Sequence, residues 1–391
     1  MVIQNQMPDT GGTKDFPLRI LHVIHGMEPG GAQALVMNIY RHIDRSQVQF
    51  DFAVRSHQPE YYDEEINTLG GRLFRVPWIS DNPLSIFRYV RSFEALLREK
   101  GPFAGLHSHV GVFSGHVLPL GKDAGIPLRI AHGHSASLSK SSILRKSWAI
   151  IMRKRIRASA THLLACSQTA AEWLYGPHWR RDSRTSLIPN AIDITAYEGI
   201  HDNRGELRRR LELPLDGPLV GHIGRFESVK NHAFLLEVFS AFLEICPAAK
   251  LILIGEGTLH GKIQRQAIEN GIERAVYFLG VRSDIPQILG SLDLFVLPSL
   301  YEGLGIALIE AQAAGVPCLV SKTVPLEADL GLDLVQFEDL EAGIGEWVRS
   351  MLKLKEKKAP AWEKRKATLQ NADYDIQDTV HRLYQLYLST Q

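Results

Sequence analysis

Short apolar runs alternate with amphipathic stretches along most of the chain. In the first half the runs have the length of buried strands, and they begin at Leu18, Val48, Leu73, Ala104, Pro127 and Thr161. Most segments between them repeat their apolar residues at helical spacing, as residues 32–43 do. Apolar strands that alternate with helices are typical of a parallel sheet with helices on both faces. The pattern therefore predicts an α/β domain of the doubly wound kind.

A polar stretch from Ile192 to Arg210 interrupts this alternation. Beyond it, strand-like runs begin at Leu219, Lys250, Ala275, Leu292 and Pro317. The sequence thus predicts two Rossmann-like domains, over residues 17–198 and 199–373, after a disordered tail at 1–16 that lacks periodicity. Ligands of open parallel sheets bind at the carboxyl ends of the strands, so two such domains are expected to face a central cleft.

Composition restricts the partners and the compartment. The 391 residues include 44 basic and 43 acidic side chains, and the resulting net charge of +1 argues against recruitment of nucleic acid. The three cysteines lie in apolar stretches, as expected for core residues in a reducing compartment: Cys166, Cys246 and Cys318. No apolar run approaches the ~18 residues that span a bilayer, and the polar start does not resemble a signal peptide. We therefore expect a cytoplasmic protein.

Two loops carry groups that suit a phosphate ligand. Gly30 and Gly31 join the first strand to a helix start, where backbone N–H groups can approach an anion, although such a pair also forms plain turns. In the second domain, Arg225 and Lys230 share one strand-to-helix loop. A planar guanidinium and a mobile ammonium can stabilise charge on a leaving diphosphate. The alternative for these two cations is a solvated surface loop.

The most informative segment runs from Leu292 to Ser321. A buried strand ends there at Pro298, a glycine-rich loop carries Glu302, and a helix of small and apolar residues contains Glu310. In one continuous helix the two glutamates would stand about 12 Å apart, much farther than the ~5 Å of paired carboxylates in a retaining glycosidase. We expect them to accept hydrogen bonds from hydroxyl groups at two places along an extended ligand. The alternative is a helix-dipole charge for one and a solvated position for the other.

Taken together, these segments resemble glycosyltransferase family 4, particularly its bacterial exopolysaccharide and capsule enzymes. The resemblance rests on the Gly30–Gly31 loop, GRFESVKN, LILIGEG, YFLG and, above all, the two spaced glutamates in PSLYEGLGIALIEAQAAGVP. It extends from about Leu18 to the C-terminus. It implies a GT-B fold whose last helix, within 374–391, packs back on the first domain. It also implies retention of anomeric configuration without a divalent metal, which agrees with the absence of an Asp-x-Asp motif in a suitable loop.

The resemblance also assigns roles to residues. It implies that Arg225 and Lys230 hold the donor diphosphate, that Glu302 contacts the donor sugar, and that Glu310 contacts the ribose. The other residues expected at the donor lie in the same segments: Gly30, Gly31, Gly224, Gly255, Gly303, Leu304 and Gly305. The implied reaction is hexosyl transfer from a nucleotide diphosphate sugar, with a UDP-sugar preferred, to a lipid-linked or saccharide acceptor in surface polysaccharide synthesis. Residues 322–327 depart from the Gly-rich loop or Pro-Glu pair of many members, which bears on donor identity.

Four histidines end two strands of the first domain, with His107 and His109 on one and His132 and His134 on the other. A zinc site is disfavoured, because neither pair has the i, i+4 spacing of a metal-binding helix and no acidic ligand stands beside them. The resemblance implies that a histidine at such a strand end approaches the reacting carbon of the donor sugar. His132 and His134 both match that place, and His134 is preferred. The catalytic candidates are therefore His134, His132, Arg225, Lys230 and Glu302.

Residues 139–158 combine many Lys and Arg side chains with Trp148, Ile150 and Ile151. A basic helix with apolar anchors can rest on an anionic membrane surface, which would bring an enzyme at the inner face of the membrane to a lipid-linked acceptor. The alternative is an amphipathic helix that packs its apolar side on its own domain.

Two other functions share these features. A nucleotide-sugar epimerase or hydrolase would need an acid/base pair near the sugar and would turn over the donor without an acceptor. A non-catalytic sugar-nucleotide-binding protein is disfavoured by the joint presence of Arg225, Lys230, Glu302 and Glu310. For a transferase we expect the acceptor to attack from the face that the diphosphate leaves, with stabilisation of the leaving group supplying most of the catalysis.

Overall fold

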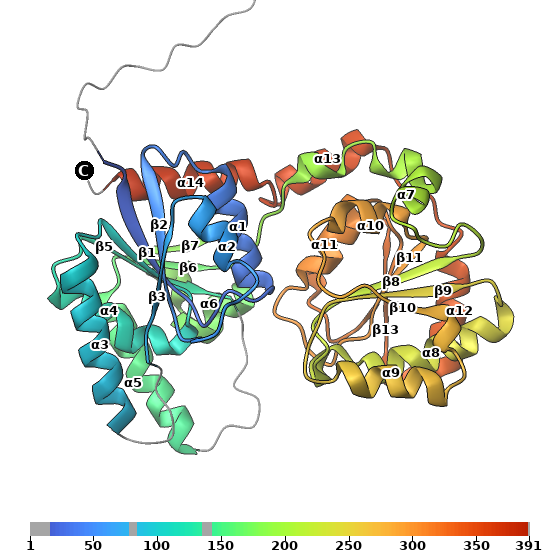
Figure 1. Cartoon of the computed structure of the whole chain (residues 1–391), viewed down its shortest axis with the longest axis horizontal. Helices are drawn as coiled ribbons and strands as arrows, with labels where there is room; N and C mark the ends of the chain where they lie inside the picture. The colour runs from blue at the N-terminus through green and yellow to red at the C-terminus, as the bar shows by residue number, and fades with distance from the viewer. Residues whose placement is uncertain (1–15, 78–83, 135–142, 390–391) are drawn as a thin grey trace, which may run out of the picture.

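A computed structural model describes residues 16–77, 84–134 and 143–389 and contains two sheets (Figure 1). The first sheet has the strand order β3-β2-β1-β4-β5-β6-β7, and the second has the order β10-β9-β8-β11-β12-β13. All strand pairs within these two sheets are parallel. The predicted pair of doubly wound, Rossmann-like α/β domains is therefore confirmed.

The N-terminal part of the chain builds the first sheet. Its strands are β1 (Leu18–Val23), β2 (Val48–Val54), β3 (Arg72–Arg75), β4 (Gly105–Ser108), β5 (Leu128–Gly133), β6 (His162–Ala165) and β7 (Thr185–Leu187). Its helices are α1 (Gly31–His42), α2 (Asp63–Thr68), α3 (Leu84–Lys100), α4 (Ser114–Asp123), α5 (Ile143–Ser159) and α6 (Gln168–Tyr175). Each predicted apolar run of this half contains a strand.

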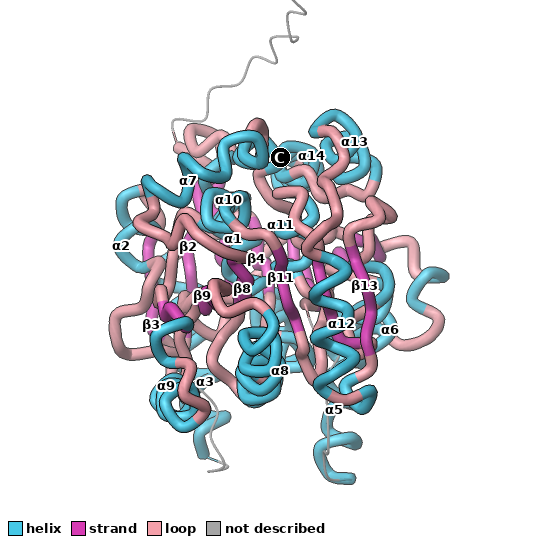
Figure 2. Tube along the Cα trace, turned by 90° about the vertical axis from the view of Figure 1, so that its right-hand side faces the viewer, coloured by secondary structure: helices cyan, strands magenta, loops and turns pink. Residues whose placement is uncertain are grey.

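The second sheet follows in the same manner. Its strands are β8 (Leu219–Ile223), β9 (Lys250–Ile254), β10 (Val276–Phe278), β11 (Leu294–Leu297), β12 (Cys318–Ser321) and β13 (Val335–Glu338). The helices after β7 are α7 (Arg204–Arg210), α8 (His232–Ile245), α9 (His260–Glu269), α10 (Ile285–Ser291), α11 (Ile306–Ala313), α12 (Ile344–Leu354), α13 (Trp362–Asn371) and α14 (Ile376–Leu388). Figure 2 shows α8 and α12 in front of the second sheet.

Both faces of each sheet carry an apolar core, because successive residues of a strand point to opposite faces. On β1, Ile20 packs with Phe50 in one cluster, whereas Leu21 belongs to a second cluster on the other face. On β9, Leu251 and Ile252 divide between two clusters in the same way. This burial on both faces explains why the strands read as apolar runs and not as alternating patterns.

Helix α14 lies on the N-terminal domain, although it ends the chain (Figure 1). Its side chains Leu383 and Tyr387 share a buried cluster with Ile20 of β1. Where the chain returns to this domain, the Ile192 N–H donates to the Tyr374 carbonyl over 2.9 Å, and the Ile376 N–H donates to the Ile192 carbonyl over 3.0 Å. The two connections between the domains are thus hydrogen-bonded side by side.

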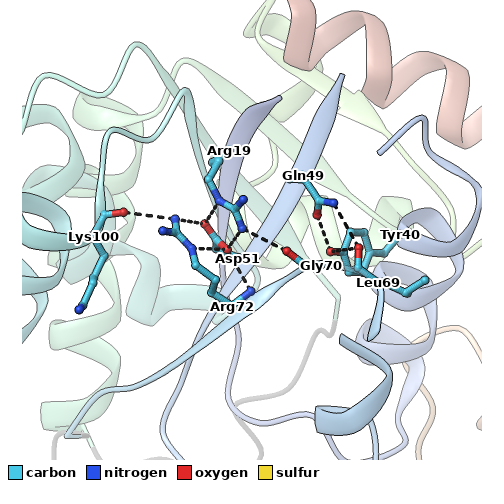
Figure 3. Close-up of polar contacts among 8 residues, drawn as sticks. All are labelled: Arg19, Tyr40, Gln49, Asp51, Leu69, Gly70, Arg72 and Lys100. Carbon is cyan, nitrogen blue, oxygen red and sulfur yellow. Dashed lines mark hydrogen bonds and ion pairs between the residues drawn. The ribbon is translucent and has the colours of Figure 1, made fainter. Parts of the chain in front are cut away.

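A buried carboxylate ties together three strands at one side of the first sheet (Figure 3). Asp51 of β2 accepts hydrogen bonds from Arg19 Nε of β1 over 2.7 Å and from Arg72 Nε of β3 over 3.0 Å. Burial acts to raise the pKa of Asp51, but the hydrogen bonds from the two arginines outweigh it and hold that pKa below its usual value. The cluster stabilises the edge of the sheet and does not reach the carboxyl ends of the strands.

Among the helices of the described ranges, none has the length and apolar character that a membrane crossing requires.

Candidate active site

The strand order changes direction between β1 and β4 in the first sheet and between β8 and β11 in the second. Ligands of doubly wound proteins bind outside the carboxyl ends of the strands at such points. Except for Glu310, which lies inside α11, the residues singled out in the sequence lie at or just beyond strand ends or at the helix starts that follow them: Gly30, Gly31, His107, His109, His132, His134, Gly224, Arg225, Lys230, Gly255, Glu302, Gly303, Leu304 and Gly305.

Lys230 and Glu302 form the centre of the C-terminal side. The Lys230 ammonium lies 2.6 Å from Glu302 Oε1, and both side chains are largely buried. Ser299 Oγ donates to the same carboxylate oxygen over 2.6 Å. The loop after β8 and the loop after β11 are therefore joined by an ion pair, which neutralises both charges while no ligand is bound.

Two glycines allow the loops after β8 and β9 to approach each other. Gly255 has φ +132°, and a Cβ at this position would lie 2.2 Å from the carbonyl oxygen of Gly224. A Cβ at Gly224 would in turn lie 3.1 Å from the methylene carbons of Lys230. A side chain at Gly255 would collide with the backbone, and one at Gly224 would crowd the stem of Lys230, so glycine at both positions lets this stem lie along the backbone.

Helix α11 presents its N-terminus to the same loop. Gly305 caps the helix in the left-handed conformation, with φ +82°. Leu304 is buried in the apolar core, so only its backbone can face a ligand. Glu310 lies one turn and a half into the helix, near the buried Tyr197, and burial raises the pKa of this carboxyl to about 7. None of the described residues forms a hydrogen bond with its carboxylate, which leaves the group ready for a ligand.

Arg225 differs from Lys230, because no described residue forms a hydrogen bond or ion pair with its side chain. Its side chain is exposed on the loop after β8, and no carboxylate of the described residues pairs with it. A guanidinium that no described residue engages, in the same loop as the Lys230–Glu302 pair, is suited to an incoming anion. The structure thus places the two predicted phosphate-binding cations in one loop, and of the two only Lys230 has an ion-pair partner among the described residues.

On the N-terminal side, Gly30 is the N-cap of α1 and Gly31 is the first residue of that helix. A Cβ at Gly31 would lie 3.2 Å from Asn190 Nδ2. Asn190 follows β7 and is 6% exposed, and its Oδ1 atom is buried without a hydrogen-bond partner among the described residues. The sequence analysis did not single out Asn190, because an asparagine after a proline reads as an ordinary turn residue.

The predicted histidines meet in one buried network, which also contains His22 of β1. His22 Nδ1 lies 3.0 Å from His109 Nε2, and His109 Nδ1 lies 2.8 Å from His134 Nε2. His132 is fully buried, whereas His134 retains some exposed surface. The sequence analysis missed His22, since one histidine inside an apolar strand carries no signal of function.

Burial keeps these imidazoles neutral. It lowers the pKa of His134 to about 4 and the pKa of His132 well below the usual value, the latter with help from neighbouring imidazoles. Ligand atoms of His22, His107 and His109, and those of His109, His132 and His134, lie within 4.8 Å of one another, so both triads could hold a transition metal. However, no carboxylate accompanies them in these described triads, and most of these nitrogens are already engaged in imidazole–imidazole hydrogen bonds.

Comparison with known proteins agrees with this geometry. The pattern of the family described as Glycosyltransferase Family 4 matches residues 29–196, and that of Glycosyl transferases group 1 matches residues 203–335. EpsF of Bacillus subtilis, a glycosyltransferase by name, is 38% identical over 376 residues, which cover 95% of this chain and 97% of that protein. The chain therefore belongs to the same glycosyltransferase family as EpsF.

This glycosyltransferase is also similar to more distant relatives and to solved structures. The UDP-Gal:alpha-D-GlcNAc-diphosphoundecaprenol alpha-1,3-galactosyltransferase of Escherichia coli is 25% identical over 350 residues, 85% of this chain and 87% of that one. Among solved structures, HepE of Anabaena in complex with UDP has a TM-score of 0.71 at 18% identity and covers 95% of this chain and 100% of its own. The lipopolysaccharide glycosyltransferase WaaG has a TM-score of 0.69 at 16% identity, with 94% and 99% covered. The predicted GT-B fold is confirmed.

The basic segment of the glycosyltransferase follows β5 along the chain. Residues 139–142 are outside the described residues, and the rest of the segment lies in α5. Met152 and Ile156 pack into the domain, but Ile150 and Ile151 are 53% and 55% exposed beside the exposed Lys154. Helices α3 and α5 extend from the same end of the N-terminal domain (Figures 1 and 2). The helix thus packs on its own domain and still exposes apolar side chains among basic ones.

Proposed function

We propose that this glycosyltransferase moves a hexosyl group from a UDP-sugar to a lipid-linked or saccharide acceptor in exopolysaccharide synthesis, with retention of anomeric configuration and without a divalent metal. The observation that carries the proposal is the Lys230–Glu302 pair beside the start of α11, with Glu310 in the same helix and without a hydrogen bond from any described residue. The two carboxylates thus lie on either side of the helix N-terminus, where we expect phosphate, sugar and ribose to bind.

Donor binding would change the ion-pair and hydrogen-bond partners of Lys230, Glu302 and Glu310. The diphosphate would draw the Lys230 ammonium away from Glu302 and would also engage Arg225. Glu302, released from its ion pair but still held by Ser299, would then accept hydrogen bonds from hydroxyls of the donor sugar. Glu310 would accept hydrogen bonds from the ribose. Stabilisation of the leaving diphosphate by two cations and helix N–H groups supplies the charge that a metal ion would otherwise provide.

The relatives support the choice of donor and acceptor. HepE structures contain UDP and UDP-glucose, and the name of the galactosyltransferase from Escherichia coli specifies a UDP-sugar donor and an acceptor linked to diphosphoundecaprenol. A lipid-linked acceptor also fits the exposed isoleucines and lysines of α5, which would rest on the inner face of the membrane. The comparisons and the surface of α5 support the choice of donor and acceptor and the location at the membrane. The proposal of retained stereochemistry rests on the family resemblance and on the low pKa values of the histidines.

Same-face attack is the mechanism that the family resemblance implies, and the groups on the N-terminal side are compatible with it. A double displacement needs a carboxylate close to the reacting carbon, but the N-terminal side presents neutral imidazoles and the asparagine Asn190. An epimerase or hydrolase would need an acid/base pair there, and a histidine with a pKa of about 4 is a poor base partner. The same-face mechanism requires only that the acceptor hydroxyl passes its proton to the leaving phosphate.

The experiment that tests this function measures donor binding and turnover together. Thermal stabilisation by UDP-, GDP- and ADP-sugars in the presence of chelator should appear for one nucleotide series and should disappear in Arg225→Ala and Glu310→Ala. Arg265→Ala, which removes an exposed arginine of α9, is the matched control and should behave as wild type. Loss of donor turnover on addition of chelator, or a trapped covalent sugar adduct, would refute the mechanism.

A further inference from the structure

Glu302 has two hydrogen-bond donors, and both use the same carboxylate oxygen. The Lys230 ammonium and the Ser299 hydroxyl each lie 2.6 Å from Oε1. None of the described residues donates a hydrogen bond to Oε2. Although the Glu302 side chain is only 10% exposed, Oε2 is not sealed from solvent. Glu302 thus has one oxygen occupied by the protein and a second oxygen available to a ligand.

The two donors to Glu302 differ in what binding of a nucleotide sugar would do to them. In the proposed function the diphosphate draws the Lys230 ammonium away from the carboxylate. Ser299 carries no charge that a phosphate would attract, and this residue is fully buried. Its hydroxyl is therefore the contact that stays with Glu302 when the donor is bound. The position of Oε2 during the reaction then depends on Ser299.

Ser299 is itself held by two hydroxyl groups that follow the neighbouring strand. Strand β11 ends at Leu297, and the next residue, Pro298, has no N–H group that could continue the ladder with β12. Beyond this point the Ser299 carbonyl accepts hydrogen bonds from Ser321 Oγ over 2.6 Å and from Thr323 Oγ1 over 2.5 Å. Side chains thus continue the connection between the two strands where the backbone ladder stops.

The number of protons makes these two hydroxyl groups partly redundant. A carbonyl oxygen only accepts, whereas each hydroxyl has one proton to donate. The hydroxyl oxygens of Ser321 and Thr323 also lie 2.8 Å apart, so one of them can donate to the other while the second donates to Ser299. Either hydroxyl alone can therefore hold the carbonyl. Loss of both would leave a carbonyl of a fully buried residue unpaired, which favours a shift of Ser299.

The backbone after Ser299 is fixed from the other side. The Leu300 N–H donates to the Val229 carbonyl over 2.8 Å, and Val229 directly precedes Lys230. This bond joins the loop after β11 to the loop after β8 without using the side chain of Lys230. Movement of the ammonium to a phosphate would therefore leave the backbone that carries Ser299 in place.

We propose that Ser299 is a positioning residue, held by Ser321 and Thr323, which keeps Glu302 Oε2 in place for a hydroxyl of the donor sugar after Lys230 has turned to the diphosphate. The inference rests on the proposed function for the identity of the ligand, a nucleotide sugar. Ser299 acts through Glu302 and does not touch the ligand. The three hydroxyl residues therefore affect recognition of the sugar and not that of the nucleotide.

Ser299→Ala tests this role in the full-length protein and needs no acceptor. Calorimetry with UDP, UDP-glucose and UDP-galactose measures the affinity with and without a sugar. Because hydrogen bonds to charged groups are strong and depend on position, we expect the Kd of the better-bound UDP-sugar to rise about tenfold or more. The Kd of UDP should change less than about threefold. Equal increases for UDP and the UDP-sugar would overturn the inference.

Ser291→Ala is the matched control. Ser291 is also fully buried, and its hydroxyl donates over 2.6 Å to the Ile288 carbonyl within α10. Ser299→Ala and Ser291→Ala should therefore lose similar stability in thermal unfolding, whereas Ser291→Ala should bind every ligand as the wild type does. A wild type that binds neither UDP nor a UDP-sugar would refute the proposed function. Wild-type binding by Ser299→Ala, next to normal binding by the wild type, would refute only the present inference.

A double-mutant cycle separates positioning of Glu302 from a general structural role. If Ser299 acts through the carboxylate, Ser299→Ala should change the Kd of the UDP-sugar less than about twofold in a protein that already carries Glu302→Ala. A structural role would lower the affinity by the same factor in both backgrounds, and this result would overturn the proposal.

The two hydroxyls behind Ser299 are tested in the same assay. Ser321→Ala and Thr323→Val should each raise the Kd of the UDP-sugar by no more than about threefold, because the remaining hydroxyl still holds the carbonyl. The double variant should approach the tenfold loss of Ser299→Ala, with UDP binding again within about threefold. A double variant that is no weaker than the product of the two single effects would refute the shared hold on Ser299.

Discussion

Replacing Glu310 by glutamine should stabilise the unliganded protein and weaken donor binding at the same time. Burial raises the pKa of Glu310 from 4.5 to about 7. A carboxyl with a folded pKa above its unfolded pKa binds its proton more tightly in the folded state. The free energy of unfolding therefore falls as pH rises through this interval and stays low above it. A pKa shift of this size lowers the free energy of unfolding by about 3 kcal/mol at pH 8.

The glutamine of the Glu310→Gln variant cannot ionise, so the difference between the two proteins isolates this one group. Well below pH 4.5 both side chains are neutral in both states, and the two proteins should be about equally stable. At pH 8 the Glu310→Gln protein should be more stable by about 3 kcal/mol, which raises the melting temperature by about 10 °C for a domain of this size. Thermal unfolding of both proteins at a series of pH values from about 4 to about 8 measures the difference directly.

Donor binding should change in the opposite sense. Because the ionised carboxylate is the stronger acceptor for ribose hydroxyls, wild-type affinity for the nucleotide should rise as the pH increases through about 7. The affinity of Glu310→Gln should be lower and should not show this rise. Loss of a hydrogen bond to a charged group costs about 1.5–3 kcal/mol, or a 10- to 100-fold weaker Kd. A melting-temperature difference that is the same at every pH, or undiminished affinity, would refute the reasoning.

Three further predictions concern other parts of the molecule. Lys230→Met should lower kcat about 100-fold or more, because it removes charge stabilisation from the leaving diphosphate. It also removes the ammonium group that lies 2.6 Å from the Glu302 carboxylate. Steady-state kinetics measures the effect, with a substitution of Lys262, an exposed lysine of α9, as the control. Asp51→Asn should lower the free energy of unfolding by about 2–3 kcal/mol at pH 7. As the pH falls through the lowered pKa of Asp51, the wild type alone should lose the stability that the ionised carboxylate contributes. Acid unfolding of both proteins measures this difference. Ile150→Ser with Ile151→Ser should reduce sedimentation with anionic vesicles and leave turnover of a water-soluble acceptor unchanged; equal sedimentation would exclude α5 as a membrane contact.

Most strands that sequence could predict are buried on both faces, although the runs at Leu73 and Ala275 also contain the edge strands β3 and β10. The runs at Leu18, Lys250 and Leu292 consist almost wholly of apolar residues, and the structure places β1, β9 and β11 in them. The edge strands β7 and β13 were not predicted, because Thr185–Leu187 and Val335–Glu338 are short, partly exposed and mixed in polarity. An edge strand needs fewer apolar residues, and its position depends on pairing with a neighbour that local sequence does not reveal.

Sequence could show which candidate residues share one loop or helix, but it could not show contacts between strands. The spacing of Glu302 and Glu310 within one loop and helix was visible from the chain alone. The ion pair between Glu302 and Lys230 was not, because it joins two loops 72 residues apart. His22 and Asn190 were also missed, since each is a single polar residue whose partners come from β4, β5 and α1. The importance of such residues depends on packing of parallel strands, which brings their carboxyl ends to one edge.

The candidate site residues of the two domains differ in their charge, and this difference restricts where pH can act on the reaction. The N-terminal side offers imidazoles that stay neutral, with pKa values of about 3 for His22 and about 4 for His134, together with the uncharged Asn190. The C-terminal side holds the charged groups, and of these Glu310 alone among the groups assigned here has a pKa raised to about 7. A neutral N-terminal side cannot stabilise an oxocarbenium ion by charge, so the barrier must be lowered where the diphosphate leaves, at Arg225 and Lys230. If that is correct, the pH profile of donor turnover should carry one ionisation near 7, which disappears in Glu310→Gln and persists in His134→Gln.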